Sequence, residues 1–206
     1  MLIFDIETGP LDKAEEPIFE PRKGTKDPEK QAEQIEAKRR EWLDSAALDA
    51  YTGEALAIGW IDTHEPKNGV NVLCQNGAEE RSIIERFFGH VDTHPEAIVG
   101  FNSRRFDLPF LIRRAWILGV RVPMGVINRC RNYDLHIDLM ELWQCGDRQY
   151  KTRGLDYMSK SLGLSGKTGS GKDFAQLFAE DQERALDYLR SDVVLTYKCA
   201  KRMGVA

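Results

Sequence analysis

Apolar residues alternate with other residues at the start of the chain, and this period of two is typical of a strand that packs on a core. Leu2, Phe4 and Ile6 would share one face of that strand. Later segments with the same signal include a pair separated by Asn68-Gly69, a turn that predicts a hairpin. The predicted strands span residues 2–7, 55–61, 70–73, 97–101 and 134–139.

Other segments space their apolar residues at the helical period, as Ile83, Ile84, Phe87 and Phe88 do. The predicted helices span residues 79–88, 108–118, 155–162, 175–179 and 182–203. Strands therefore come first, and strands and helices alternate afterwards. This order favours an α/β or α+β layer with a mixed sheet.

Residues 10–50 interrupt the pattern with four prolines and a dense run of charges. Asp27 could cap a helix whose first turn contains Pro28, and the composition favours a helix to about Leu43. About 40 residues are too few for an independent core. We therefore interpret residues 1–206 as one domain with a charged, partly helical insertion, which we expect to act as a lid or a partner-docking arm.

Composition narrows the class of protein. No apolar stretch approaches the roughly 20 residues of a membrane span, and no secretory signal is evident at the N-terminus. The four cysteines are scattered and favour reduced thiols in a cytoplasmic protein. The net charge of −4 argues against a general nucleic-acid coat protein.

Arginines nevertheless gather in residues 101–131, where Asp107 is the single acid. The run is either a solvated helix face with loops or a rim that attracts phosphates. These arginines are Arg104, Arg105, Arg113, Arg114, Arg121, Arg129 and Arg131.

The first strand carries two acids on one face, because Asp5 and Glu7 are two residues apart. Two adjacent carboxylates raise each other's pKa unless a cation lies between them. The alternative is an edge strand with a solvated face. Asp107 stands at a strand-to-helix junction, where it could also serve as a helix cap.

Tyr188 and Asp192 are four residues apart and share one face of the last predicted helix with the apolar Leu195. A carboxylate on the apolar side of a helix needs a partner. The alternative is an exposed aspartate beside a half-buried tyrosine. Together with Asp5, Glu7 and Asp107, this helix completes the layout of a four-carboxylate site for divalent metals.

Three separated motifs resemble the DEDD superfamily of 3′–5′ exonucleases, and in particular standalone relatives of the proofreading exonuclease domain of family B DNA polymerases. The motifs are Phe4-Asp-Ile-Glu-Thr-Gly9, Phe101-Asn-x-x-x-Phe-Asp107 and Tyr188-x-x-x-Asp192. Tyr188 places the chain in the tyrosine subgroup. The resemblance implies a DnaQ-like, RNase H-like fold with a mixed five-stranded sheet and flanking helices. The insertion at residues 10–50 departs from compact members.

The resemblance also implies roles for the motif residues. Asp5 would bridge two divalent cations, Mg²⁺ or Mn²⁺. Glu7 and Asp192 would hold the ion that carries the attacking water, and Asp107 would hold the second ion. Tyr188 would orient the water, because a phenol with a pKa near 10 is a poor base at neutral pH. The substrate contacts expected from the same motifs are Thr8, Gly9, Asn102 and Phe106.

The expected function is therefore metal-dependent hydrolysis of single-stranded nucleic acid from its 3′ end, with DNA favoured over RNA and nucleoside 5′-monophosphates released. An exoribonuclease with the same site and a non-catalytic nucleic-acid-binding module are the alternatives. Proofreading would need a polymerase or repair partner, since this chain is too short to contain a polymerase.

Three further patterns are weaker signals. Residues 166–173 approach a phosphate-binding P-loop, but Asp173 stands where that loop needs Ser or Thr. We expect a Gly-rich loop near the substrate instead. His90 and His94 fit a helix end better than a metal site, and Asp138 fits the cap of the following helix better than a fifth acid of the site.

Overall fold

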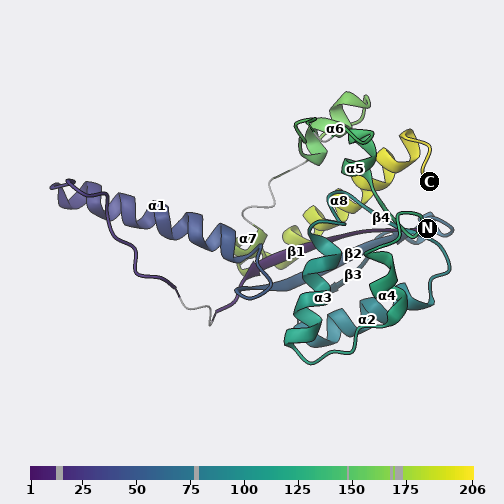
Figure 1. Cartoon of the computed structure of the whole chain (residues 1–206), viewed down its shortest axis with the longest axis horizontal. Helices are drawn as coiled ribbons and strands as arrows, with labels where there is room; N and C mark the ends of the chain where they lie inside the picture. The colour runs from purple at the N-terminus through teal and green to yellow at the C-terminus, as the bar shows by residue number, and fades with distance from the viewer. Residues whose placement is uncertain (13–15, 77–78, 148, 168, 170–173) are drawn as a thin grey trace.

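The structure is a computed structural model that describes residues 1–12, 16–76, 79–147, 149–167, 169 and 174–206. Its centre is a five-stranded sheet in the order β3-β2-β1-β4-β5 (Figure 1). β1 and β2 are antiparallel, as are β2 and β3, whereas β1–β4 and β4–β5 are parallel. The predicted mixed sheet and the hairpin are confirmed. The strands are β1 (Leu2–Pro10), β2 (Gly53–Asp62), β3 (Asn71–Cys74), β4 (Ile98–Gly100) and β5 (His136–Asp138).

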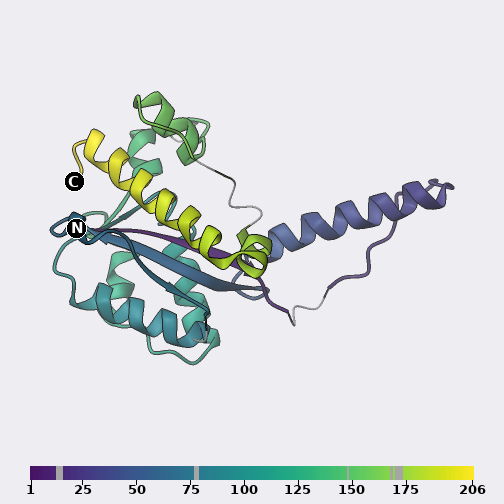
Figure 2. The ribbon, with the colours of Figure 1, turned by 180° about the vertical axis from the view of Figure 1, so that it is seen from behind.

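Helices cover both faces of the sheet, and each face has its own apolar cluster. The first cluster joins α2, α3 and α4 to one face, and the second joins α5, α6, α7 and α8 to the other (Figure 2). The helices are α1 (Pro28–Ala46), α2 (Glu80–Thr93), α3 (Asp107–Ile117), α4 (Met124–Arg129), α5 (Leu139–Gln144), α6 (Leu155–Ser161), α7 (Phe174–Glu180) and α8 (Gln182–Arg202), and a short 3-10 turn, η1, spans Pro66–Asn68.

The alternation predicted for β1 decides which side chains meet α8. Leu2, Phe4 and Ile6 are buried in the cluster of α2 and α3, as predicted. Ile3 lies in the opposite cluster, with α8. Asp5 and Glu7 share the parity of Ile3 and therefore face the α8 layer. A register shift between Glu7 and Thr8 in the β1–β2 pairing then breaks the strict alternation just beyond the acids.

The predicted helix of the insertion is confirmed and extends to Ala46. Asp27 is its N-cap and accepts a hydrogen bond from the Glu29 amide, and Pro28 opens the first turn. The helix projects from the body in both views (Figures 1 and 2). Within it, only Ala46 is buried.

The extended segment that precedes α1 packs along one side of this helix, and the other side faces solvent. Arg39 pairs with Glu16 at 2.6 Å, and the Lys38 Nζ donates to the Glu20 carbonyl at 2.8 Å. Phe19 and Trp42 make an edge-to-face contact with ring centroids 6.3 Å apart. The arm therefore consists of α1 and the segment that precedes it. Contacts between these two parts support the arm outside the core.

Two predictions need correction. Helix α4 was not expected, because it has only six residues and its pattern after Pro123 is too short to show a period. The arginines of residues 101–131 do not all form a solvated or phosphate-attracting rim. Arg114 and Arg129 are buried. Arg114 pairs with Glu80 and donates to the Ala50 carbonyl, and Arg129 donates to the carbonyls of Gly125 and His94.

No helix in the described part of the chain is long and apolar enough to cross a membrane. All four cysteines carry free thiols, as the scattered spacing predicted. His90 and His94 lie at the end of α2, His94 as its C-cap, and their rings stack with centroids 6.3 Å apart.

His136 in β5 is expected to make folding sensitive to acid. It is fully buried, and its Nε2 lies 2.9 Å from the Ser103 hydroxyl. Burial first, and then the nearby Arg104 and Arg129, lower its pKa to about 3. Below a pH of about 6.5, His136 is protonated in the unfolded chain and neutral in the folded chain. The free energy of unfolding therefore falls as the pH drops from about 6.5 toward 3, by up to about 1.4 kcal/mol per pH unit.

Urea unfolding across this pH window measures the effect. The variant His136→Gln keeps a hydrogen-bonding group and does not titrate, so its free energy of unfolding should fall less steeply with acid. Parallel slopes for the wild type and the variant would contradict the assignment, whatever their absolute stabilities.

Candidate active site

Three carboxylates converge where β1 passes under α8. Ligand oxygens of Asp5, Glu7 and Asp192 all lie within 4.8 Å of one another. The two-residue spacing in β1 puts Asp5 and Glu7 on the α8 side, and the opposing turn of α8 supplies Asp192. Glu7 and Asp192 are buried, Asp192 with 1% of its surface exposed. The edge-strand and exposed-aspartate alternatives are therefore wrong.

Asp107 joins this cluster from α3. It is the first residue of the helix and is buried, and its Oδ1 accepts a hydrogen bond from the Ile6 amide at 3.2 Å. The charge of Asp5 also raises the pKa of Asp107, so the two carboxyl groups are neighbours. The alternative of a helix cap is wrong, because Phe106 is the N-cap residue and no side chain caps the helix. A contact across 101 residues of sequence therefore fixes Asp107 beside the strand.

The environment of this cluster disfavours the ionised form of its carboxyl groups. Burial, followed by the charge of Asp192, raises the pKa of Asp5 to about 7, although Lys167 opposes the shift. Burial and then the charge of Asp5 raise the pKa values of Glu7 and Asp107 as well. Divalent cations would remove this cost, and carboxylate oxygens are the hard ligands that Mg²⁺ and Mn²⁺ accept. The donor set therefore fits divalent cations.

Lys167 is the one cation against the cluster in the described part of the chain. Its Nζ lies 2.5 Å from Asp192 Oδ2. Burial alone would lower the pKa of Lys167, but the charge of Asp192 and the hydrogen bond to it raise the pKa overall. Sequence reasoning did not single out this lysine, because the Gly-rich segment suggested only a loop near the substrate. Most of the P-loop-like stretch, residues 168 and 170–173, lies outside the described residues.

Tyr188 stands one helical turn before Asp192, on the same face of α8. Its hydroxyl is buried and has no hydrogen-bond partner among the described residues, and the same holds for Asp192 Oδ1. Burial raises the pKa of Tyr188 above its ordinary value. Two buried polar atoms without partners in the acidic cluster are consistent with a polar ligand there, since such atoms are normally satisfied.

A groove of about 820 Å³ opens over the cluster. Its walls include most of the residues expected at the site: Asp5, Glu7, Thr8, Asn102, Phe106, Asp107, Tyr188 and Asp192. Gly9 is not among them. A Cβ at Gly9 would come within 2.7 Å of Leu56 Cδ1 and 3.1 Å of Ala175 Cβ, so close packing explains the glycine.

The insertion, expected to act as a lid or a partner-docking arm, contributes one wall of this groove. Arg40, Asp44 and Leu48, from the end of α1 and the turn after it, line the groove together with the acidic cluster. Leu48 is 61% exposed. The charged sequence of the arm gave no sign of which end would reach the site.

Asp138 caps α5, as expected, and does not belong to the acidic cluster. Its carboxylate accepts hydrogen bonds from the Met140 and Glu141 amides, and also from the amides of Asn102 and Arg104. Asn102 has a φ of 62°, a left-handed conformation that asparagine tolerates. Asp138 thus fixes the loop that carries Asn102 to the groove.

Known proteins resemble this chain in sequence. Residues 48–205 match the family described as "Predicted 3'-5' exonuclease related to the exonuclease domain of PolB". The chain is 45% identical over 79 residues to a DNA polymerase of Thermococcus litoralis, covering 35% of this chain and 5% of that protein. It is 26% identical over 142 residues to a DNA polymerase of Archaeoglobus fulgidus, covering 61% of this chain and 18% of that protein.

A solved structure extends the likeness in fold to nearly the whole chain. The family B DNA polymerase from Pyrobaculum calidifontis aligns with a TM-score of 0.62 and 22% identity, over 98% of this chain and 24% of that chain. The expected RNase H-like, α/β architecture is confirmed by this match together with the sheet order. The chain spans a small part, between 5% and 24%, of the length of these three polymerases.

Proposed function

Because the chain belongs to the family of predicted 3′–5′ exonucleases related to the exonuclease domain of PolB, we propose that it is a two-metal 3′–5′ exonuclease. Its substrate would be single-stranded nucleic acid, with DNA favoured, and its products nucleoside 5′-monophosphates. The observation that carries the proposal is the meeting of Asp5, Glu7 and Asp192, with Asp107 beside them, in one groove.

In this proposal the four carboxylates would hold two divalent cations, Mg²⁺ or Mn²⁺, and Asp5 would serve both of them. When bound, the cations supply an activated water and charge stabilisation at the scissile phosphate. Four carboxylates balance the formal charge of two such ions. Desolvation of the carboxylates, which raises the pKa of Asp5, also strengthens their attraction for cations.

Tyr188 would orient the attacking water by hydrogen bonding. Its raised pKa keeps the phenol protonated at neutral pH, which favours orientation of the water over general-base action. Thr8 and Asn102 would contact the terminal nucleotide in the groove. Phe106 would mainly pack, since its ring lies 5.5 Å from that of Phe110.

Replacing Tyr188 by phenylalanine is expected to lower kcat by roughly 10- to 100-fold and to leave KM nearly unchanged, because only orientation of the water is lost. Steady-state rates on a labelled single strand measure both constants. The pH dependence of kcat should keep its shape in the variant. A variant that lost a rising limb near neutral pH would instead identify Tyr188 as a titrating base.

The arm of residues 16–46 is proposed to act as a partial lid, because its C-terminal end already lines the groove. Removing residues 16–44 with a short linker, which takes Arg40 and Asp44 out of the groove wall, should raise KM for single strands and preserve the fold. An unchanged KM in a folded variant would remove the lid interpretation and leave partner docking.

The proposal is tested with matched DNA and RNA single strands labelled at the 5′ end, incubated with Mg²⁺ or Mn²⁺ and, in parallel, with chelator. Exonuclease action from the 3′ end gives a ladder that shortens one nucleotide at a time, and a blocked 3′ end prevents it. The faster substrate decides between deoxyribonuclease and exoribonuclease. Tight binding of the strand without any ladder would favour the non-catalytic module.

A further inference from the structure

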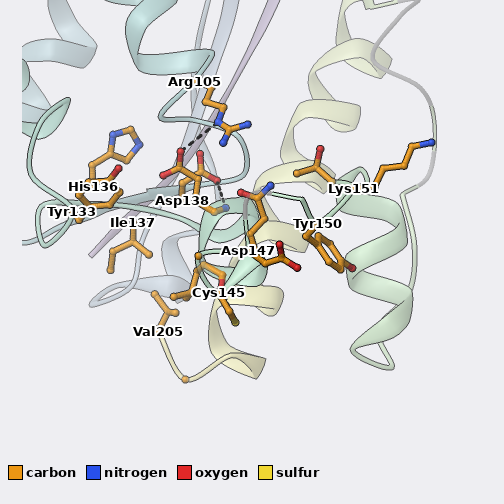
Figure 3. Close-up of a pocket in the computed structure, with 16 residues that line it drawn as sticks. Arg105, Tyr133, His136, Ile137, Asp138, Cys145, Asp147, Tyr150, Lys151 and Val205 are labelled. Carbon is orange, nitrogen blue, oxygen red and sulfur yellow. Dashed lines mark hydrogen bonds and ion pairs between the residues drawn. The ribbon is translucent and has the colours of Figure 1, made fainter.

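A second hollow, of about 1240 Å³, lies beside β5 and α5 and belongs to no part of the acidic cluster (Figure 3). Arg105 and Tyr133 stand on one side of it, and Tyr150 and Lys151, from the segment after α5, stand on the other. Asp138 lies between them, at the end of β5. The hollow therefore sits on the other side of the loop that carries Asn102 to the catalytic groove.

The hollow and the catalytic groove are linked by residues that each shares with one small cavity. Tyr150 and Thr152 line both the hollow and a small cavity next to it, and Phe101 lines both this small cavity and the catalytic groove. The same extended segment continues to Gly154 and Leu155 in the groove wall. Residues 150–155 thus form a track that leads from the hollow to the acidic cluster.

Aromatic rings lie beside basic side chains along the track and around the hollow. The Arg153 guanidinium stacks 4.3 Å from the centre of the Tyr157 ring, and the Arg104 guanidinium stacks 3.7 Å from that of Tyr133. Tyr133 is 69% exposed, and Tyr150 is 38% exposed. Exposed aromatic rings beside basic side chains are the features by which proteins bind single strands without reading their sequence.

Most acidic side chains near the track already have an ion-pair or hydrogen-bond partner. Glu141 pairs with Arg104 and Arg105, at 3.3 and 3.4 Å, and Asp138 is satisfied by backbone amides. Asp147 accepts from the Gln149 amide and remains the acid without a cation nearby in the described chain. Lys151 and Arg153 are exposed. Neither is in an ion pair with a described residue, so both are free to meet phosphates.

An extended peptide that adds to the edge of the sheet is the competing occupant, and the backbone of β5 disfavours it. The His136 amide donates to the Asn132 carbonyl, and the His136 carbonyl accepts from Arg104 Nη1 at 2.9 Å. Strand addition needs such edge groups to be free. A partner that binds through side chains and phosphates fits the hollow better.

We propose that the hollow and its track bind the single strand upstream of the 3′-terminal nucleotide, with bases on Tyr150 and Tyr133 and phosphates near Lys151, Arg153 and Arg105. This inference rests on the proposed function, because it supplies the path by which a strand reaches the acidic cluster. Binding at the track makes the affinity for the substrate depend on strand length. A dinucleotide fills only the catalytic groove, whereas a longer strand also occupies the track.

Fluorescence anisotropy tests the track without hydrolysis. A labelled DNA strand of about 12 nucleotides, and an unlabelled dinucleotide as competitor, are bound to the full chain in Ca²⁺. Tyr150→Ala should weaken binding of the long strand roughly 5- to 150-fold, the range for loss of one stacked base. Tyr150→Phe should bind nearly as the wild type, although its hydrogen bond from Trp143 is lost.

Lys151→Gln should make the salt dependence of long-strand binding shallower by about 0.7 in the slope of log K against log salt. Lys67→Gln, which removes an exposed charge from η1, is the matched control and should change nothing. Dinucleotide affinity should be the same in all these variants. Equal long-strand affinity in Tyr150→Ala and the wild type would overturn the track and leave the hollow to a protein partner.

The two proposals can fail separately. Binding that depends on Tyr150 and on length, in a protein that yields no 3′ ladder, would keep the track and remove the exonuclease. The protein could also yield a 3′ ladder while its affinity for single strands depends neither on strand length nor on Tyr150. That result would keep the exonuclease and remove the track.

Discussion

Replacing Asp5 by asparagine is expected to slow release of the 3′-terminal nucleotide by roughly 10³-fold or more. Ligand oxygens of Asp5 lie close to those of Glu7 and Asp192, and the charge of Asp5 also acts on Asp107, so we expect Asp5 to serve both proposed cations. Asparagine keeps the shape and removes the charge. Single-turnover hydrolysis of a labelled strand measures the loss, and Glu85→Gln, an exposed acid of α2, is the matched control. A loss below tenfold would contradict a shared ligand.

The same substitution should stabilise the protein when metal is removed. The pKa of Asp5 is raised in the folded chain, to about 7, above its value in the unfolded chain. The metal-free fold therefore loses stability as the pH rises from about 4 to 7. Above that range the ionised carboxylate of Asp5 destabilises the fold. At pH 8 in chelator, Asp5→Asn should unfold at a higher urea concentration than the wild type. Added Mn²⁺ should raise the midpoint of the wild type and not that of the variant.

Replacing Arg114 by methionine is expected to cost about 3–5 kcal/mol of unfolding free energy, because it leaves a buried charge without its partner. Arg114 and Glu80 are both buried, and Arg114 Nη2 lies 2.6 Å from Glu80 Oε2. Arg114 Nη1 also donates to the Ala50 carbonyl, at the base of the arm. The pair therefore ties α2 and α3 to the segment that leads from α1 into β2.

Urea unfolding at neutral pH measures this cost, with Lys160→Met as the control. Lys160 forms an exposed pair with Asp156 at 2.7 Å, so its loss should change stability by no more than about 0.5 kcal/mol. The double variant Arg114→Met with Glu80→Leu should recover part of the loss, because it removes both buried charges. A loss below about 1 kcal/mol for Arg114→Met alone would show that the pair is not the anchor described.

Local rules explain why much of the fold could be predicted. The alternation of Leu2, Phe4 and Ile6 was enough to place β1 and to put Asp5 and Glu7 on the opposite side. Asp27 and Pro28 marked the start of α1 through capping chemistry that depends only on neighbouring residues. In the same way, Asp138 was expected to be a cap, and its hydrogen bonds to the start of α5 agree.

Contacts between distant segments could not be predicted in this way. The burial of Arg114 depends on Glu80 and on Ala50, 64 residues away, and a charge run carries no sign of such partners. Lys167 and Asp192 form an ion pair although they lie in different segments of the chain. The wall that α1 adds to the groove likewise depends on the direction in which the insertion leaves the sheet. The roles of the acids and of Tyr188 stay predictions until they are measured.

We expect Asp5, Glu7, Asp107 and Asp192 to form one site for two divalent cations. Counting Mn²⁺ by electron paramagnetic resonance, with a nucleoside 5′-monophosphate present, tests it most directly. We predict that the wild type takes up about two ions per chain, that Asp107→Asn loses one, and that Asp5→Asn loses both. Uptake by the wild type that is unchanged in Asp5→Asn, or absent from the folded wild type, would contradict the claim.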